Sequence, residues 1–161
     1  MAVTNQLSTQ KANAAASPKV MNPAGDEGGK LRIARFNFVQ AGAGDATSTV
    51  DLVDLPRGRV NIVTALSKVA WSAFGSARTL DIGLRAYTKI DNSVNAEAPA
   101  ELDDDIDVSS AGTAAPGSDL SSKDKIRTVT SQQGVTVFAS VAGGTIPDGA
   151  TLDGYIVYTT D

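Results

Sequence analysis

Alternation with a period of two residues between Thr79 and Thr88 is the feature that most constrains the fold of this chain. Apolar side chains fall on one side of an extended backbone and mostly polar ones on the other: Leu80, Ile82, Leu84 and Ala86 against Thr79, Asp81, Gly83, Arg85 and Tyr87. This period is typical of a β-strand with one face in the core. We expect a strand over 79–88, with Asp81, Arg85 and Tyr87 as candidate interface residues on its outer face.

Seven further short runs are rich in β-forming residues, and clusters of glycine and proline separate many of them. The runs are residues 31–39, 47–55, 59–66, 68–74, 125–131, 134–144 and 150–161. Because helical periodicity is almost absent, the pattern predicts an all-β protein: a single β-sandwich of about eight strands, jelly-roll or immunoglobulin-like. The order of the strands stays open at this point.

The first run, LRIARFNFV, has two apolar phases. Leu31 and Ile33 share one phase, whereas Phe36 and Phe38 share the other. A switch of phase inside one strand predicts either a β-bulge or burial on both faces.

The 161 residues favour one domain, which is large enough to bury a core without disulfides or metals. Residues 1–29 are rich in small and polar residues and lack periodicity, so we expect a flexible N-terminal arm. The β-sandwich domain is then expected over 30–161, and residues 89–124 should be its least regular part.

Composition excludes several function classes. The chain has no cysteine and no histidine, which removes thiol chemistry, cysteine-ligated metals and the commonest general base. Its net charge of −4 and pI of about 4.7 argue against a nucleic-acid partner. No run is apolar for the roughly 20 residues of a membrane span, and the N-terminus lacks a signal-peptide pattern.

The net charge conceals an uneven distribution along the chain. Residues 30–90 hold nine basic and four acidic residues, whereas residues 91–161 hold three basic and twelve acidic ones. Two interpretations follow: the halves pair within one fold, or oppositely charged faces meet between neighbouring subunits, where complementary potentials fix the register.

The stretch ELDDDIDVSS, residues 101–110, is the densest group of carboxylates. Asp103, Asp105 and Asp107 have the spacing that opens an EF-hand loop, which makes them a weak calcium candidate. Val108 and Ala114 stand where that motif has glycine and glutamate. The alternatives are a solvated acidic loop and an acidic strand edge that discourages aggregation.

No other motif carries chemistry. A glycosidase carboxylate pair would need a sugar cleft, usually with aromatic platforms, and the chain has few aromatic residues. The glycine-rich pieces AGAGDA and VAGGT do not match a phosphate-binding loop. Trp71 is expected in the core or at a subunit contact. We expect no enzymatic activity and no cofactor.

Three blocks, residues 44–60, 72–88 and 141–161, resemble a group of small structural proteins encoded beside the major capsid protein of tailed bacteriophages. These proteins are head decoration, or cement, proteins. The resemblance implies a homo-oligomer, dimer or trimer, made in the host cytoplasm. It further implies that the protein binds the major capsid protein on the capsid exterior and locks neighbouring capsomers together. It implies no catalytic residues.

Two alternatives remain beside this interpretation. The first is another virion part, such as a tail-tube, neck or fibre-base protein. The second is a calcium-dependent carbohydrate-binding module, for which the acidic stretch is the only support.

Overall fold

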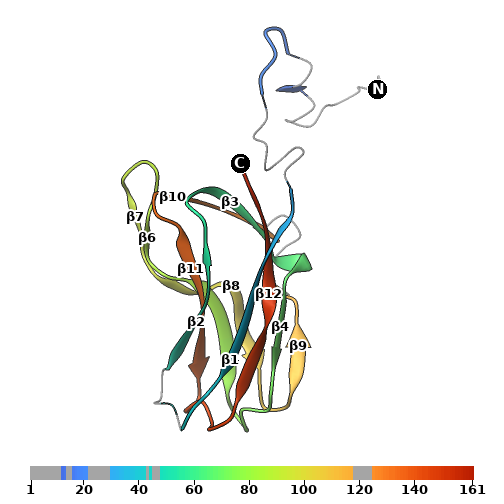
Figure 1. The fold of residues 1–161 in the computed structure, drawn as a ribbon, viewed down its shortest axis with the longest axis vertical. Coiled ribbons are helices and arrows are strands. Elements are labelled where there is room, and N and C mark those ends of the chain that lie inside the picture. The colour runs from blue at the N-terminus through green and yellow to red at the C-terminus, as the bar shows by residue number, and fades with distance from the viewer. Residues whose placement is uncertain (1–11, 14–15, 22–29, 43, 45–47, 118–124) are drawn as a thin grey trace, which may run out of the picture.

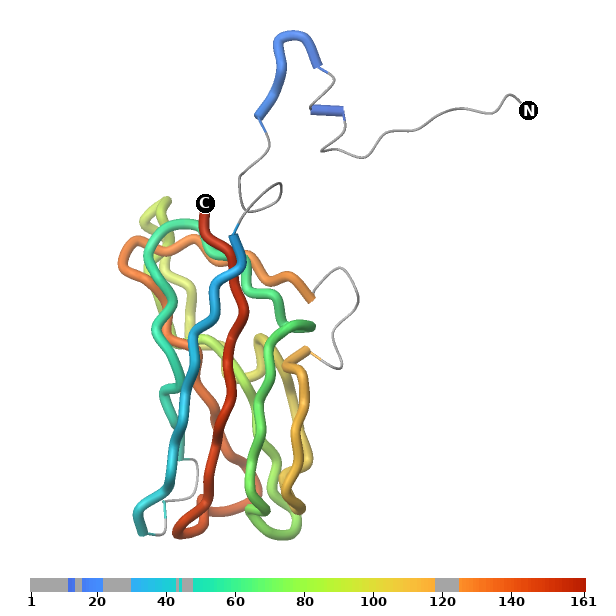
Figure 2. Tube along the Cα trace, turned by 45° about the vertical axis from the view of Figure 1, so that its right-hand side comes forward, coloured from blue at the N-terminus to red at the C-terminus, as the bar shows by residue number. Residues whose placement is uncertain are grey.

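The computed structural model describes residues 12–13, 16–21, 30–42, 44, 48–117 and 125–161. Two antiparallel β-sheets pack face to face over these residues, and the chain end lies beside the start of the first strand (Figures 1 and 2). The prediction of an all-β sandwich is confirmed.

Sheet A has six strands, and its central strand is β12 (Thr151–Thr160). One edge of β12 pairs along its length with β1 (Arg32–Val39). The other edge pairs in turn with β4 (Lys68–Trp71) and β3 (Gly58–Val63), which the short 3₁₀ helix η1 (Thr64–Leu66) separates. Beyond them lie β9 (Gly112–Ala114), paired with β4, and β10 (Ile126–Ser131), paired with β3.

Sheet B has four strands in the order β2 (Thr49–Leu55), β11 (Val135–Ala142), β5 (Thr79–Leu84) and β8 (Ala98–Asp107). The strands β6 (Tyr87–Thr88) and β7 (Val94–Asn95) form a separate small hairpin between β5 and β8 in the chain. This hairpin projects at the end of the sandwich where the chain ends (Figure 1).

Strand pairing identifies the sandwich as a jelly roll. If β3–β4, β5–β6, β7–β8 and β9–β10 are each taken as one interrupted strand, eight long strands remain. The first pairs with the eighth, the second with the seventh, the third with the sixth and the fourth with the fifth. This pairing gives the jelly-roll rather than the immunoglobulin arrangement. Twelve strands are therefore present in the described residues where about eight were expected, because breaks divide four of the long strands.

A core of aliphatic and aromatic side chains fills the space between the sheets. The largest buried members are Phe74, Leu55, Ile62, Leu80, Ile82, Leu84, Leu102, Ile146, Leu152 and Ile156. They come from both sheets and from the connections at the ends, as the alternation along each strand requires.

One expectation about strands was wrong, and one long strand was not predicted. The strand expected over 79–88 ends at Leu84, and Ala86, expected in the core, is exposed because the chain leaves sheet B for the β6–β7 hairpin. Among the described residues, 89–117 hold a smaller share of strand than the rest of the sandwich, as expected, but the ten-residue strand β8 within them was not predicted. Its apolar residues are too sparse to alternate, so its sequence resembles a loop.

Part of the expected N-terminal arm lies within the described residues. The carbonyl of Asn13 accepts hydrogen bonds from the N–H groups of Ala16 and Val20. Residues 1–11, 14–15 and 22–29 lie outside the described residues, so the arm and the domain boundary after residue 29 stay predictions. None of the helices in the described residues has the length and hydropathy of a transmembrane segment.

Candidate functional site

The acidic stretch forms an edge of sheet B rather than a loop. Residues Glu101–Asp107 lie in β8, which has β5 as its only neighbour in the sheet among the described strands. Of the two alternatives to an ion site, the acidic strand edge is therefore the arrangement present. Carboxylates along an edge hinder another strand from pairing with it.

The three aspartates predicted as calcium ligands do not come together. The side chain of Asp103 is buried, with 1% of its surface exposed, and its Oδ1 accepts the N–H of Asp104. Asp107 is exposed, and its Oδ1 accepts the N–H of Ser109 at 2.8 Å, which lowers the pKa of Asp107. Asp105 belongs to a different group of carboxylates.

A β-bulge in β8 explains why the spacing of Asp103, Asp105 and Asp107 does not bring them to a common site. Leu80 pairs with Ile106 and Ile82 with Asp103, so Asp104 and Asp105 both oppose the single residue Asp81. Asp105 adopts a left-handed backbone conformation with φ of 53°. The extra residue interrupts the alternation on which the i, i+2, i+4 spacing depends.

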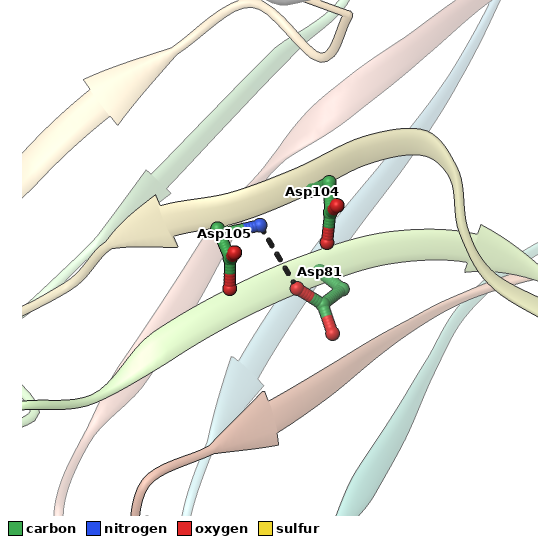
Figure 3. A group of neighbouring side chains, drawn as sticks. All are labelled: Asp81, Asp104 and Asp105. Carbon is green, nitrogen blue, oxygen red and sulfur yellow. Dashed lines mark hydrogen bonds between the residues drawn. The ribbon is translucent and has the colours of Figure 1, made fainter.

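The bulge brings Asp81, Asp104 and Asp105 into one group, with carboxylate oxygens within 4.8 Å of one another (Figure 3). Oδ1 of Asp81 accepts the N–H of Asp105 at 3.0 Å, and Oδ2 accepts the hydroxyl of Ser140 at 3.3 Å. Asp81 therefore has a structural role at the bulge. Each carboxylate offers one ligand atom here, whereas calcium takes about six to eight oxygen ligands.

Arg85 covers the centre of the outer face of sheet B. Its guanidinium lies 4.0 Å from the ring centroid of Phe138, whose side chain is fully buried beneath it. It donates hydrogen bonds to Asp51 at 2.8 Å, Glu97 at 3.1 Å and Thr49 at 2.6 Å. Burial opposes the charged form, but these partners outweigh it and raise the pKa of Arg85. The predicted interface residue thus holds several segments of its own sheet together.

The other two interface candidates lie deeper. Trp71 is 9% exposed and belongs to the core, and its indole N–H donates to the carbonyl of Ser110 at 2.9 Å. Tyr87 is half-buried and packs against the core, and this burial raises its pKa. Whether Asp81, Arg85, Tyr87 or Trp71 meets a partner stays a prediction, since each already makes contacts within the chain.

The charge difference along the sequence becomes a difference between the two sheets. The strands of sheet A carry Arg32, Arg35, Arg59, Lys68 and Arg127 but only one acidic residue, Asp153. The strands of sheet B carry eight acidic residues and no basic one: Asp51, Asp54, Asp81, Glu101, Asp103, Asp104, Asp105 and Asp107. The sandwich therefore has one basic and one acidic sheet.

Sequence reasoning missed a set of exposed apolar residues on sheet A. The side chains of Ile33 in β1, Leu66 in η1 and Ile126 in β10 are 63%, 52% and 57% exposed. The phase switch in LRIARFNFV was the sequence signal for Ile33, but it was interpreted wrongly. The register of β1 against β12 is continuous and Ile33 faces outward, so there is neither a bulge nor burial on both faces of β1.

No family model and no curated protein matches the chain. Among solved structures, a chain in the capsid of Ralstonia phage GP4 matches with 20% identity and a TM-score of 0.57, over 88% of this chain and 91% of that chain. A chain in the cyanophage Pam1 capsid asymmetric unit matches with 15% identity and a TM-score of 0.56, over 100% of both chains. The infectious bursal disease virus VP2 subviral particle matches with 10% identity and a TM-score of 0.50, over 83% of this chain and 33% of that one. These likenesses concern the fold.

Proposed function

We propose that this chain is a non-enzymatic structural protein of a tailed-phage virion that binds the outside of the head as a decoration, or cement, protein. The observation that carries the proposal is the near-complete coverage in both directions between this chain and chains from two phage capsids. Those chains are of about the same length as this one. The likeness therefore extends over a whole small capsid component and not over one domain of a larger one.

The three sequence blocks that resemble head decoration proteins support the same role. They cover β2, β5 and β12, which are distributed over both sheets. The proposed partner is the major capsid protein of neighbouring capsomers, and a dimer or trimer of this chain would occupy a symmetry position of the head.

Physical linkage explains how such a protein would act without catalysis. A protein that binds the assembled shell and not its dissociated subunits adds its binding free energy to the stability of the shell. Many copies at fixed spacing then act together, because each copy that contacts two capsomers makes the second contact at high effective concentration.

Co-sedimentation with undecorated shells of the phage that encodes the chain tests the proposal. We expect saturable binding with a fixed number of copies per capsomer. Mature, fully decorated particles serve as the control, since their sites are already filled. Absence of binding to undecorated shells, or density for this chain in the tail, neck or fibre base of the virion, would replace the head assignment with another virion role.

A further inference from the structure

The outer face of sheet A, called face A below, is ordered in rows that cross its strands. One polar row contains Thr159, Asn61 and Thr128, which are adjacent in register and joined by hydrogen bonds through the side chain of Asn61. Asn61 is buried, so this row is internally satisfied.

The next row is apolar. Ile33 pairs with Val157, and Val63 pairs with Ile126. Tyr158 pairs with Ile62 in antiparallel register. Val157 directly precedes Tyr158 and Val63 directly follows Ile62, so the four side chains form one line across the sheet. Val157 is only 5% exposed, whereas Ile33 and Ile126 at the two ends remain largely exposed.

The turn η1 extends this apolar row. Ser67 Oγ accepts the N–H of Val157 and donates to the carbonyl of Val63, both at 2.9 Å, which holds the end of the turn against the row. Leu66, directly before Ser67, is half exposed. Ile33, Leu66 and Ile126 thus present aliphatic surface from three separate elements.

A basic row follows on the same face. Tyr155 pairs with Arg35 on one side and with Lys68 on the other. Arg35 and Lys68 are exposed, and neither forms an ion pair with any residue in the described part of the chain. They line a depression of about 490 Å³ together with Tyr155, Phe36, Asn37, Ala70 and Gly154. The one carboxylate among the described residues that line this depression, Asp153, accepts a hydrogen bond from the side-chain amide of Asn37. Two cations beside an aliphatic row are suited to a surface that carries both carboxylates and apolar side chains.

The outer side of sheet B has the opposite character. Its strands are acidic, and none of the large exposed apolar residues among the described residues lies in them. The single cation at its centre, Arg85, is already bound to Asp51 and Glu97. Sheet B therefore has the composition of a solvated surface.

A second copy of this chain fits face A poorly. Two copies meeting through face A would bring basic rows together in one desolvated contact, where like charges repel. Sheet B of a second copy would match the charge of face A, but it offers no exposed large apolar side chain to Ile33, Leu66 and Ile126. Self-association would therefore leave either the positive charge or the exposed aliphatic side chains of face A without a complementary partner.

We propose that face A is the surface that docks on the shell and that sheet B faces the solvent. The occupant of face A is an acidic protein surface with exposed aliphatic residues, contributed by the major capsid protein. This inference rests on the proposed function and adds an orientation to it. Arg35 and Lys68 would pair with carboxylates of the shell, while Ile33, Leu66 and Ile126 would lose their contact with water.

Single-cysteine footprinting tests the orientation directly, because the chain has no cysteine of its own. Ile126→Cys and Thr113→Cys each place a thiol on face A, whereas Asp54→Cys and Asp104→Cys each place one on sheet B. All four of these residues are exposed. In free protein, all four thiols should react with a maleimide. On undecorated shells, we expect at least about tenfold slower labelling on face A and unchanged labelling on sheet B.

Several results would overturn the orientation. If the sheet B thiols are protected on shells while the face A thiols still react, the orientation is the reverse of the one proposed. Protection of face A in free protein that rises with concentration would assign the face to a second copy. If the protection of face A disappears when residues 1–29 are deleted, the occupant of face A is the chain's own N-terminal segment. If duplex DNA alone protects the face A thiols, the occupant is nucleic acid. If the unsubstituted protein fails to sediment with shells, the proposed function fails instead.

Charge reversal provides a second, energetic test. Arg35→Glu with Lys68→Glu should weaken shell binding by about tenfold or more, with a reduced dependence of affinity on salt. Arg57→Glu with Lys89→Glu changes the net charge equally at the end of the sandwich and should stay within about twofold of the unsubstituted protein. Equal weakening by both pairs would mean that only net charge matters and would contradict a specific face.

Discussion

Asp81 illustrates how one side chain resolves a local irregularity of a sheet. The bulge at Asp104 and Asp105 interrupts the ladder between β5 and β8, and the freed N–H of Asp105 finds the carboxylate of Asp81. The bulge leaves this N–H without a partner in the ladder, and the carboxylate of Asp81 supplies one, a bond with a typical net contribution of about 1 kcal/mol. The cost is a concentration of three negative charges at one point of the edge.

Two substitutions of Asp81 distinguish its role as a hydrogen-bond acceptor from the effect of its negative charge. Asp81→Ala removes the acceptor and should lower the free energy of unfolding by about 1 kcal/mol. Asp81→Asn keeps an oxygen at this position and relieves repulsion from Asp104 and Asp105, so its stability should stay within about 0.5 kcal/mol. Urea denaturation measures both. A larger loss for asparagine than for alanine would contradict the role of Asp81 as an acceptor.

Acid should weaken the fold through exposed carboxylates whose native pKa is lowered. Hydrogen bonds from Ser109 lower the pKa of Asp107, and hydrogen bonds from Ser93 lower that of Asp91. A group with a lowered native pKa stabilises the fold above its unfolded pKa and loses this contribution as pH falls through the native pKa. The melting temperature should therefore fall below about pH 4, and less steeply in Asp91→Asn combined with Asp107→Asn. Identical pH profiles would contradict this assignment.

At the scale of elements, sheet B is stabilised by side-chain contacts and close backbone packing between its strands. Arg85 follows β5, stacks on Phe138 of β11 and bonds to Asp51 and Thr49 of β2. The register of β5 against β8 shifts a second time between Ile82 and Leu84, and Gly83 lies at this shift. Glycine permits the close approach, because a Cβ there would lie 2.1 Å from the carbonyl oxygen of Ala98 and 2.2 Å from that of Pro99. The two residues secure opposite edges of the sheet.

Loss of the Arg85 guanidinium should loosen β2. Arg85→Met keeps the aliphatic chain over Phe138 but removes the charge and the hydrogen bonds. We expect a decrease of about 1–2 kcal/mol in the free energy of unfolding, a modest value because the side chain is 28% exposed and water screens its ion pairs. Arg57→Met in the exposed turn after β2 serves as the control and should change stability by less than about 0.5 kcal/mol. Equal effects would refute the special position of Arg85.

A methyl group at Gly83 should displace β8. Gly83→Ala drives its Cβ into two backbone carbonyls that cannot move without breaking pairs of the edge strand, so we expect a loss of about 2 kcal/mol or more. Gly149→Ala is the comparison, because it meets no atom within 4 Å and suffers only from its φ of +72°, at about 1 kcal/mol. Thermal unfolding should rank the two in this order, and the reverse order would contradict the close approach of β5 and β8.

Sequence predicted the strands whose inner residues alternate and missed those whose irregularities break the alternation. β5 and β12 were predicted because Leu80, Ile82, Leu152 and Ile156 keep a period of two. β8 was missed because its bulges place Leu102 and Asp103 side by side in the core. The order of the strands depends on pairings between distant residues, which no local pattern encodes.

At the scale of the whole molecule, the candidate docking face follows from the fold and not from any motif. Ile33 and Ile126 are far apart in the sequence, and only the pairing of β1, β12, β3 and β10 brings them to one row. Ser67 holds the end of η1, which carries Leu66, against the same row. The same pairing gathers basic residues on one sheet and acidic residues on the other. A rigid sandwich with two unlike faces is suited to binding one partner in one orientation.

The melting temperature of undecorated shells, measured by calorimetry with and without this protein, tests the central claim of adhesion most directly. Because binding only to the assembled state stabilises that state, we expect the shell transition to rise with added protein and to level off when the sites are filled. The Arg35→Glu, Lys68→Glu variant should need a higher concentration for the same rise. A shell transition that does not move at saturating protein would contradict the account.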